Sequence, residues 1–201
     1  MIDVMRAAKP NPRAAAKQAS HERIVSAAAR AIRRRGYDGV GVAEVMKEAG
    51  LTHGAFYAHF TSREAMLAEA ASRACAESAA AAAGVASSVP SEKALAAMLR
   101  AYLSREHVDN TEAGCPLAAL GSETPRQARD VRRVTTRHVK EMVDFVARQS
   151  PDWGQPGAHD RAIVTVATMV GALLLARAVD EPALSERLRK AALSHLVPRG
   201  A

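Results

Sequence analysis

The stretch that decides the fold is GLTHGAFYAHFTSRE, residues 50–64. Apolar residues recur at helical spacing in the segment just before it: Val42, Val45, Met46 and Ala49. Gly50 is expected to end that short helix, because glycine enters the left-handed conformation without a Cβ clash. Thr52 is expected to cap the next helix, in which Phe56 and Phe60 face inward. The pattern predicts a helix-turn-helix whose second helix carries polar groups in its first turns, as docking in the DNA major groove requires.

A further helix is expected to follow this motif without a linker. Thr61 and Glu64 have the spacing of a capping box. The alanine-rich stretch beyond them predicts helix to about Ala83, ending at Gly84, because alanine is the best helix former. A rigid helix that leaves the motif in this way can carry motion from elsewhere in the protein.

The segment before the motif predicts a helix from a cap at Ser20 through Arg35. Its inward face is expected to consist of Ile24, Ala27, Ala28, Ala31 and Ile32. The arginine run 33–35 would complement the helix dipole, and attraction of DNA phosphates would add to that role. Residues 1–19 contain two prolines and are expected to form a mobile basic tail, with an arm in the DNA minor groove as the alternative.

Composition narrows the class of protein. The chain has 201 residues, of which 48% are hydrophobic, so it can bury a sizeable core and is not disordered. Its two cysteines, Cys75 and Cys115, argue against a disulfide framework and fit a reducing cytoplasm. The first twenty residues hold no apolar segment typical of a secretory signal. The apolar stretch 162–176, about 15 residues long, is short of a membrane span and predicts a buried helix.

The positive charge is concentrated in the part of the chain that holds the motif. The formal net charge is +7, and residues 1–64, with eleven Lys or Arg and six Asp or Glu, contribute +5 of it. A basic excess at this place favours phosphate binding. The alternative is a solvated basic surface that maintains solubility.

No segment alternates convincingly with a period of two, so the protein is expected to be all-α. The further helices are expected at Ser91–His107, Pro116–Gly121, Pro125–Gln149, His159–Val179 and Pro182–Leu196, with a loop over Ser150–Ala158. Asp180 is expected to cap the last helix. The predicted organisation is the tail (1–19), a three-helix DNA-binding domain (20–66) and a C-terminal helical domain (67–201).

Residues 22–66 resemble the DNA-binding domain of the TetR family of transcriptional regulators. The landmarks are Ile24, Ala28, Gly36-Tyr37, Val45, Glu48-Ala49-Gly50, Gly54, Phe56-Tyr57, Phe60, Arg63-Glu64 and Met66. One internal segment, residues 114–117 (GCPL) together with 121–123 (GSE), resembles a feature of one subgroup of that family. The resemblance implies a cytoplasmic homodimer that binds a palindromic DNA operator, most often a repressor that a small-molecule effector releases. We expect no cofactor, no metal and no membrane association.

The resemblance also implies which residues meet DNA: Thr52, His53, Gly54, Ala55, Tyr57, His59 and Arg63. His53 would read a base, Ala55 would touch a thymine methyl group, and Tyr57 would contact a phosphate. The sequence departs from the family pattern at Val40-Gly41, where Thr and Ser are common, and also at Ala43 and Ala58.

An effector pocket and a dimer surface are expected in the C-terminal domain. The pocket would be largely aliphatic, because only three of the seven aromatic residues lie outside the DNA-binding part; its candidate lining is Met98, Tyr102, Cys115, Leu117, Met142, Phe145 and Met169. The last two helices would pair with a second copy through Ile163, Val166, Val170, Leu173, Leu174, Leu184 and Leu188. The alternative for both sets is packing within their own domain.

Two other functions compete with this interpretation. An all-α enzyme would need a catalytic constellation, and the sequence offers no phosphate-binding glycine loop, no metal-ligand spacing and no nucleophile elbow. A structural DNA-binding protein would need no large central helical region. Cys115 precedes Pro116 at an expected helix start, so it is either a thiol that senses oxidants or electrophiles or a small buried residue that fills space.

Overall fold

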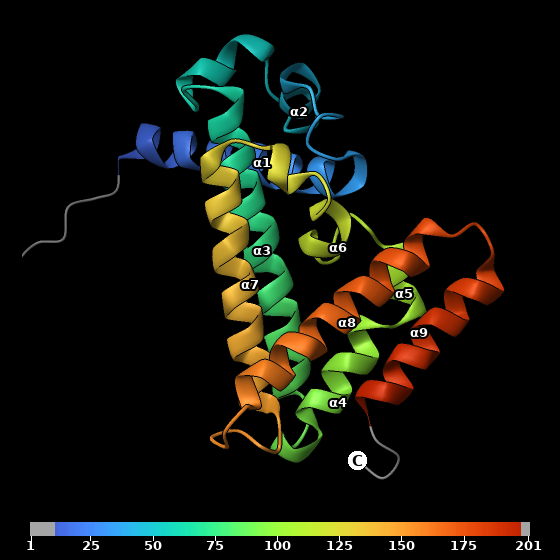
Figure 1. The fold of residues 1–201 in the computed structure, drawn as a ribbon. Helices are drawn as coiled ribbons and strands as arrows, with labels where there is room; N and C mark the ends of the chain where they lie inside the picture. Colours follow the sequence, from blue (N-terminus) through green and yellow to red (C-terminus); the bar gives the residue numbers. More distant parts are fainter. Residues whose placement is uncertain (1–10, 198–201) are drawn as a thin grey trace, which may run out of the picture.

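The structure, a computed structural model, describes residues 11–197 and is helical throughout, with no strand among these residues (Figure 1). The elements are α1 (Pro12–Arg35), α2 (Val42–Glu48), the 3₁₀ helix η1 (His53–Ala58), α3 (Arg63–Ser87), α4 (Ser91–Tyr102), α5 (Arg105–Asp109), α6 (Pro116–Leu120), the 3₁₀ helix η2 (Thr124–Arg126), α7 (Arg129–Gln149), α8 (Ala158–Ala178) and α9 (Pro182–Leu196). The prediction of an all-α protein is therefore confirmed.

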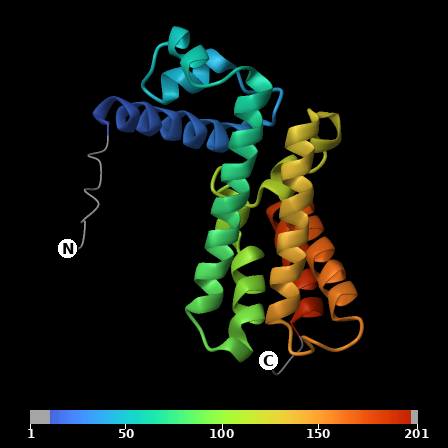
Figure 2. The ribbon, with the colours of Figure 1, turned by 90° about the vertical axis from the view of Figure 1, so that its left-hand side faces the viewer.

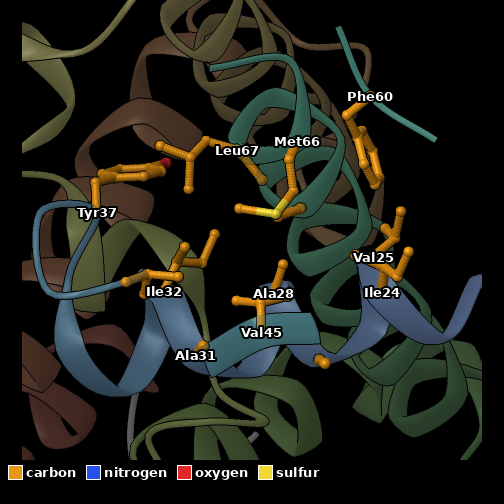
Figure 3. Close-up of a cluster of buried hydrophobic side chains, with 14 of the residues drawn as sticks. Ile24, Val25, Ala28, Ala31, Ile32, Tyr37, Val45, Phe60, Met66 and Leu67 are labelled. Carbon is orange, nitrogen blue, oxygen red and sulfur yellow. The ribbon is translucent and has the colours of Figure 1, made fainter. Parts of the chain in front are cut away.

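The N-terminal helices enclose one hydrophobic core, shown in Figure 3. Ile24, Ala28 and Ile32 of α1 are fully buried in it, as their helical spacing predicts. The core also takes in Val45 and Met46 of α2, Phe56 of η1, Phe60, and Met66 and Leu67 from the first turns of α3. Because α3 contributes directly to this core, its N-terminal end is held rigidly to the helix-turn-helix.

Helix α3 runs from the N-terminal core into the C-terminal half, where α7 packs along it (Figure 2). It is capped by Ser62, whose hydroxyl accepts the N–H of Ala65 at 3.1 Å, and not by Thr61 as the capping-box spacing predicts. It also continues through Gly84 to Ser87, because alanines on both sides favour helix and Gly84 keeps a negative φ.

Helix α1 begins nine residues earlier than expected, at Pro12 rather than after Ser20. The side chain of Asn11 accepts the N–H of Arg13 at 3.1 Å, and Pro12 occupies the first helical turn, where its missing N–H costs nothing. The prediction of a tail is thus wrong for residues 12–19, and residues 1–10 of that prediction lie outside the described residues.

Three other boundaries differ from those expected. The helix predicted over 91–107 breaks at Leu103, and Ser104 caps a separate helix α5 by accepting the N–H of His107 at 3.1 Å. Helix α7 begins at Arg129, because Pro125 lies in the 3₁₀ helix η2. Glu181, not Asp180, precedes α9.

Buried and half-buried arginines join the two halves of the chain and the C-terminal helices. The side chain of Arg33 is buried and donates to Glu77 of α3 at 2.6 Å. Arg177 of α8 donates to the carbonyls of His107 and Val108, and Arg189 of α9 donates to that of Leu103 at 2.9 Å. The break between α4 and α5 is thereby tied to α8 and α9.

Helix α8 is long and apolar enough to cross a membrane by length and composition, with a mean hydropathy of 1.6. The buried helix predicted from residues 162–176 is only partly confirmed, because 33% of the window is buried. Core helices of soluble proteins pass the same test, and α8 packs on α7, α6 and α9, so this feature is weak evidence for a membrane.

Candidate DNA-binding surface and central cavity

The second helix of the helix-turn-helix is the short 3₁₀ helix η1. Gly50 takes φ +70° and ends α2, as predicted. Thr52 occupies the N-cap position of η1, but its side chain makes no capping hydrogen bond, so the first turn depends on the bond from Ala55 N–H to the Thr52 carbonyl at 3.1 Å. The Thr52 side chain is exposed and is therefore available to other partners.

Several predicted DNA-contacting residues lie together on the exposed side of η1. Thr52, His53 and Gly54 are exposed. Tyr57 is 74% exposed, and its ring packs at 82° to the ring of Phe56. Tyrosine rings on a domain surface usually pack more fully than this, so Tyr57 is free to reach a partner. Ala55 is half-buried against the core.

Two of the predicted contact residues are held by the protein itself. Arg63 donates to the carbonyls of Tyr37 at 2.5 Å and Val40 at 3.2 Å, which ties the start of α3 to the turn after α1. His59 is half-buried beside the His21 ring, and burial is the main cause that lowers its pKa. The predicted DNA contact of Arg63 is therefore less favoured, because its guanidinium already donates to two backbone carbonyls.

The basic charge is distributed differently from the sequence-based expectation. The arginines at the end of α1 pair with carboxylates: Arg30 with Glu48, Arg33 with Glu77, Arg34 with Glu112 and Glu48, and Arg35 with Glu44. A separate basic surface, missed in the sequence, lies along the first half of α7 and consists of Arg129, Arg132, Arg133, Arg137 and Lys140. Charge summed over the C-terminal part conceals this surface, because acidic residues elsewhere offset it.

A cavity of about 340 Å³ lies among α3, α4, α7 and α8 in the C-terminal half. Its lining is Ser78, Ala79, Ala82, Ala83, Met98, Tyr102, His138, Glu141, Met142, Phe145, Val146 and Met169. Five of the seven residues predicted for a pocket are among these: Met98, Tyr102, Met142, Phe145 and Met169. The sequence did not predict that alanines 79, 82 and 83 of α3 line the cavity, because an alanine-rich segment indicates only a strong tendency to form a helix.

Cys115 and Leu117 do not line the cavity but pack beside it, in a cluster with Ala118 and Leu173. Cys115 is 1% exposed, and its backbone N–H donates to Nε2 of His107 at 3.0 Å. Since that nitrogen accepts, Nδ1 of His107 carries the proton and donates to the Tyr102 carbonyl at 2.7 Å. Burial is the main cause that lowers the pKa of His107.

His138 is the polar residue that sequence reasoning passed over. It is 2% exposed, lines the cavity, and neither ring nitrogen has a hydrogen-bond partner among the described residues. The Tyr102 hydroxyl is also buried without a partner in this part of the chain. The only sequence signal was the position of His138 on the buried face of α7, where valines 131, 143 and 146 recur at helical spacing.

The predicted dimer residues fall on two faces of α8 and α9. Leu173 and Val166 are buried inside the protomer, so they do not belong to its surface. Ile163, Leu174 and Leu184 are exposed, and Val170 and Leu188 are half-buried. Two exposed residues were missed, Val164 (57% exposed) and Leu175 (50%), and they share a face of α8 with Ile163 and Leu174.

Three or more metal-ligating side chains come together nowhere in residues 11–197.

The comparisons with known proteins agree with this architecture. Residues 24–70 match the profile of the bacterial regulatory proteins of the tetR family. No curated protein sequence matches the chain.

Solved structures share the fold over most of their length. Escherichia coli NemR in its reduced form is 20% identical, with a TM-score of 0.75 over 88% of this chain and 94% of NemR. A TetR-family regulator from Agrobacterium tumefaciens is 23% identical, with a TM-score of 0.73 over 89% and 98% of the two chains. A TetR regulator from Chloroflexus aurantiacus is 23% identical, with a TM-score of 0.74 over 90% and 94%. These structural similarities establish the fold, and the profile match over residues 24–70 identifies the helix-turn-helix domain. Residues 24–70 therefore carry a DNA-binding domain of the tetR family, in a chain whose fold is shared with TetR-family regulators.

Proposed function

We propose that the protein is a homodimeric repressor that leaves a palindromic operator when a small molecule binds in the central cavity. The observation that carries the proposal is the continuity of α3. Its first turns belong to the core of the helix-turn-helix, and its residues 78–83 line the cavity, roughly 20 Å further along the same helix. A ligand that displaces α3 at the cavity therefore displaces η1.

In this proposal η1 enters the major groove with Thr52 and His53 facing base edges and Tyr57 facing a phosphate. Two copies bind half-sites about one helical turn (~34 Å) apart. Effector binding favours dimers whose two copies of η1 no longer match that spacing.

Pairing through α8 and α9 is supported by the apolar face of α8 that holds Ile163, Val164, Leu174 and Leu175. Gly171 lies on the same face and has no side chain, and the space where a Cβ would lie is free of other atoms within 4 Å. Another helix can therefore approach closely there. An exposed apolar face of this kind is typical of an association surface.

The test is fluorescence anisotropy with a DNA fragment from upstream of the protein's own gene and a shuffled fragment of the same length. We expect preferential binding to the first fragment, a stoichiometry of one dimer per palindrome, and an affinity that falls steeply with salt. Equal affinity for both fragments at all salt concentrations would contradict sequence-specific regulation. Light scattering that reports a monomer at micromolar concentration would contradict the dimer.

A further inference from the structure

The cavity has almost entirely apolar walls. Alanines of α3 form one side, and three methionines and Phe145 form the others. Glu141, on the exposed side of α7, is the one charged residue of the described chain that lines it. A volume near 340 Å³ is at the small end of the range of about 300–1,000 Å³ for ligand pockets. An ion that entered would lose its hydration and find no buried counter-charge.

Four polar residues interrupt these walls, Ser78, Tyr102, His138 and Glu141, and two of them, Tyr102 and His138, have buried polar atoms without hydrogen-bond partners among the described residues. Within residues 11–197, neither ring nitrogen of the buried His138 has a hydrogen-bond partner, and the buried hydroxyl of Tyr102 has none either. Buried polar groups in folded proteins are nearly always hydrogen-bonded, and leaving one unpaired costs free energy. His138 makes no hydrogen bond within the described residues. A stabilising hydrogen bond therefore does not explain why a histidine lies on the buried face of α7.

The protonation states of the two groups are set by burial. Burial lowers the pKa of His138, and the negative charge of Glu141 raises it by less than burial lowers it. The imidazole of His138 is therefore neutral at neutral pH. It then offers one N–H donor and one acceptor. Burial raises the pKa of Tyr102 well above its ordinary value, so the phenol keeps its proton and can donate.

We propose that the cavity binds an uncharged, mainly apolar molecule through an oxygen-bearing group that hydrogen-bonds to His138 and Tyr102. This inference rests on the proposed function in taking the cavity to be the effector site. It adds the chemical class of the effector and the two residues that recognise it. Apolar contact with the alanine and methionine walls supplies affinity, and the two polar side chains select for the oxygen.

The test uses four probes of similar size and different polarity: butylbenzene, 4-phenyl-2-butanone, 4-phenylbutanoate and 4-phenylbutylammonium. Their affinities for the full-length protein are measured by calorimetric titration. We expect the neutral ketone to bind at least roughly tenfold more tightly than the hydrocarbon, because its oxygen can accept hydrogen bonds from both His138 and Tyr102 and the hydrocarbon can accept neither. Both ions should bind more weakly than the ketone. A tighter ion, equal affinities for ketone and hydrocarbon, or no binding by any probe at millimolar concentration would overturn the inference.

Variants assign the effect to the two side chains. His138→Leu and Tyr102→Phe should each reduce the preference for the ketone over butylbenzene, whereas Met142→Leu, a volume-conserving change in the same wall, should preserve it. The melting temperature of His138→Leu should equal or exceed that of the wild type, because the imidazole makes no hydrogen bond in the free protein. A lower melting temperature with an unchanged preference would make His138 a packing residue and contradict its role.

Operator binding without any probe is measured on the same samples. Failure of the wild type to bind DNA would refute the proposed function and leave the ranking of probes intact. Normal DNA binding with a ranking led by an ion would refute the inference alone.

Discussion

The carboxylate of Glu123 accepts the backbone N–H of Tyr37 at 2.8 Å, which joins the turn after α6 to the turn that ends α1. Gly36, the residue before Tyr37, takes φ +76°, and a Cβ there would lie 2.4 Å from Oε1 of Glu123. The close approach of the two turns therefore depends both on the glycine and on the carboxylate. Through this contact the segment beside the cavity meets the helix-turn-helix independently of α3.

Replacing Glu123 by Leu should lower the free energy of unfolding by about 1–3 kcal/mol, because the half-buried N–H of Tyr37 loses its acceptor. Glu123→Gln keeps an oxygen that can accept the same N–H and should lose clearly less. Urea unfolding of both variants checks this. If Gln and Leu cost the same, the hydrogen bond is not what stabilises the junction.

The stability of the protein should fall as the pH falls below about 6.5. Burial lowers the pKa of His138 and His107 in the folded state below the ordinary value of 6.5, so the unfolded chain takes up protons first. The stabilisation is fully present above pH 6.5 and is lost as the pH falls from there toward the lowered values. Urea unfolding between pH 5 and pH 8 should show this slope. The His138→Leu variant should show a weaker slope, and an unchanged one would exclude His138 as a contributor.

The fold was predictable where local signals agree with packing. The spacing of Ile24, Ala28 and Ile32 predicts the buried face of α1, and Gly50 ends α2 in the left-handed conformation that its residue type allows. Helix ends were less predictable, because Asn11 competes with Ser20 as a cap and the sequence does not rank them. The alanines after Pro12 decide that competition by extending the helix.

The candidate sites were likewise predictable only where local sequence signals determine them. The exposed residues of η1 follow from the motif, whereas the engagement of Arg63 by the carbonyls of Tyr37 and Val40 depends on how the chain turns back. Periodicity predicts that Leu173 and Leu174 are both on an apolar helix, but neighbouring residues on α8 face different partners. His138 was missed for a related reason: a histidine among valines has no sequence signal that separates a core residue from a cavity residue.

His53 and Tyr57 should affect DNA binding in different ways. His53→Ala should reduce discrimination at one or two base pairs per half-site by about 1–3 kcal/mol, because an exposed side chain in the first turn of η1 can reach base edges. Tyr57→Phe should weaken binding to all sequences alike, because a phosphate contact carries no base information. Affinities for a set of single-base operator variants check both. Wild-type specificity profiles for both proteins would make the assignment of roles wrong.

The two thiols should be protected in the folded protein. Cys115 is 1% exposed, and burial raises the pKa of Cys75 to about 12, so neither thiol is well placed to react as a thiolate. Modification by a thiol reagent such as 5,5′-dithiobis(2-nitrobenzoate) should be slow in buffer and complete in urea. Cys115→Ser and the wild type should then keep the same operator affinity after mild peroxide. Rapid modification of Cys115 and release of the wild type alone would favour a thiol sensor.

The arrangement of α8 separates a residue of the proposed dimer face from a core residue only two positions away in the sequence. Leu175 is 50% exposed on the face that also holds Val164, whereas Leu173 is fully buried against Cys115 and Ala118. Leu175→Asp should therefore leave the protomer folded but dissociate the dimer, because pairing would bury an unpaired carboxylate at a cost of several kcal/mol.

Leu173→Asp should instead unfold the protomer, because the same carboxylate would be buried in its own core. Circular dichroism reports the fold and light scattering reports the mass, with Leu175→Ala as the control that removes the side chain without adding charge. A Leu175→Asp variant that stays dimeric at micromolar concentration would place the pairing surface away from this face of α8. Loss of operator affinity in Leu175→Asp, with its helix content unchanged, would show that the two copies of η1 must bind as a pair.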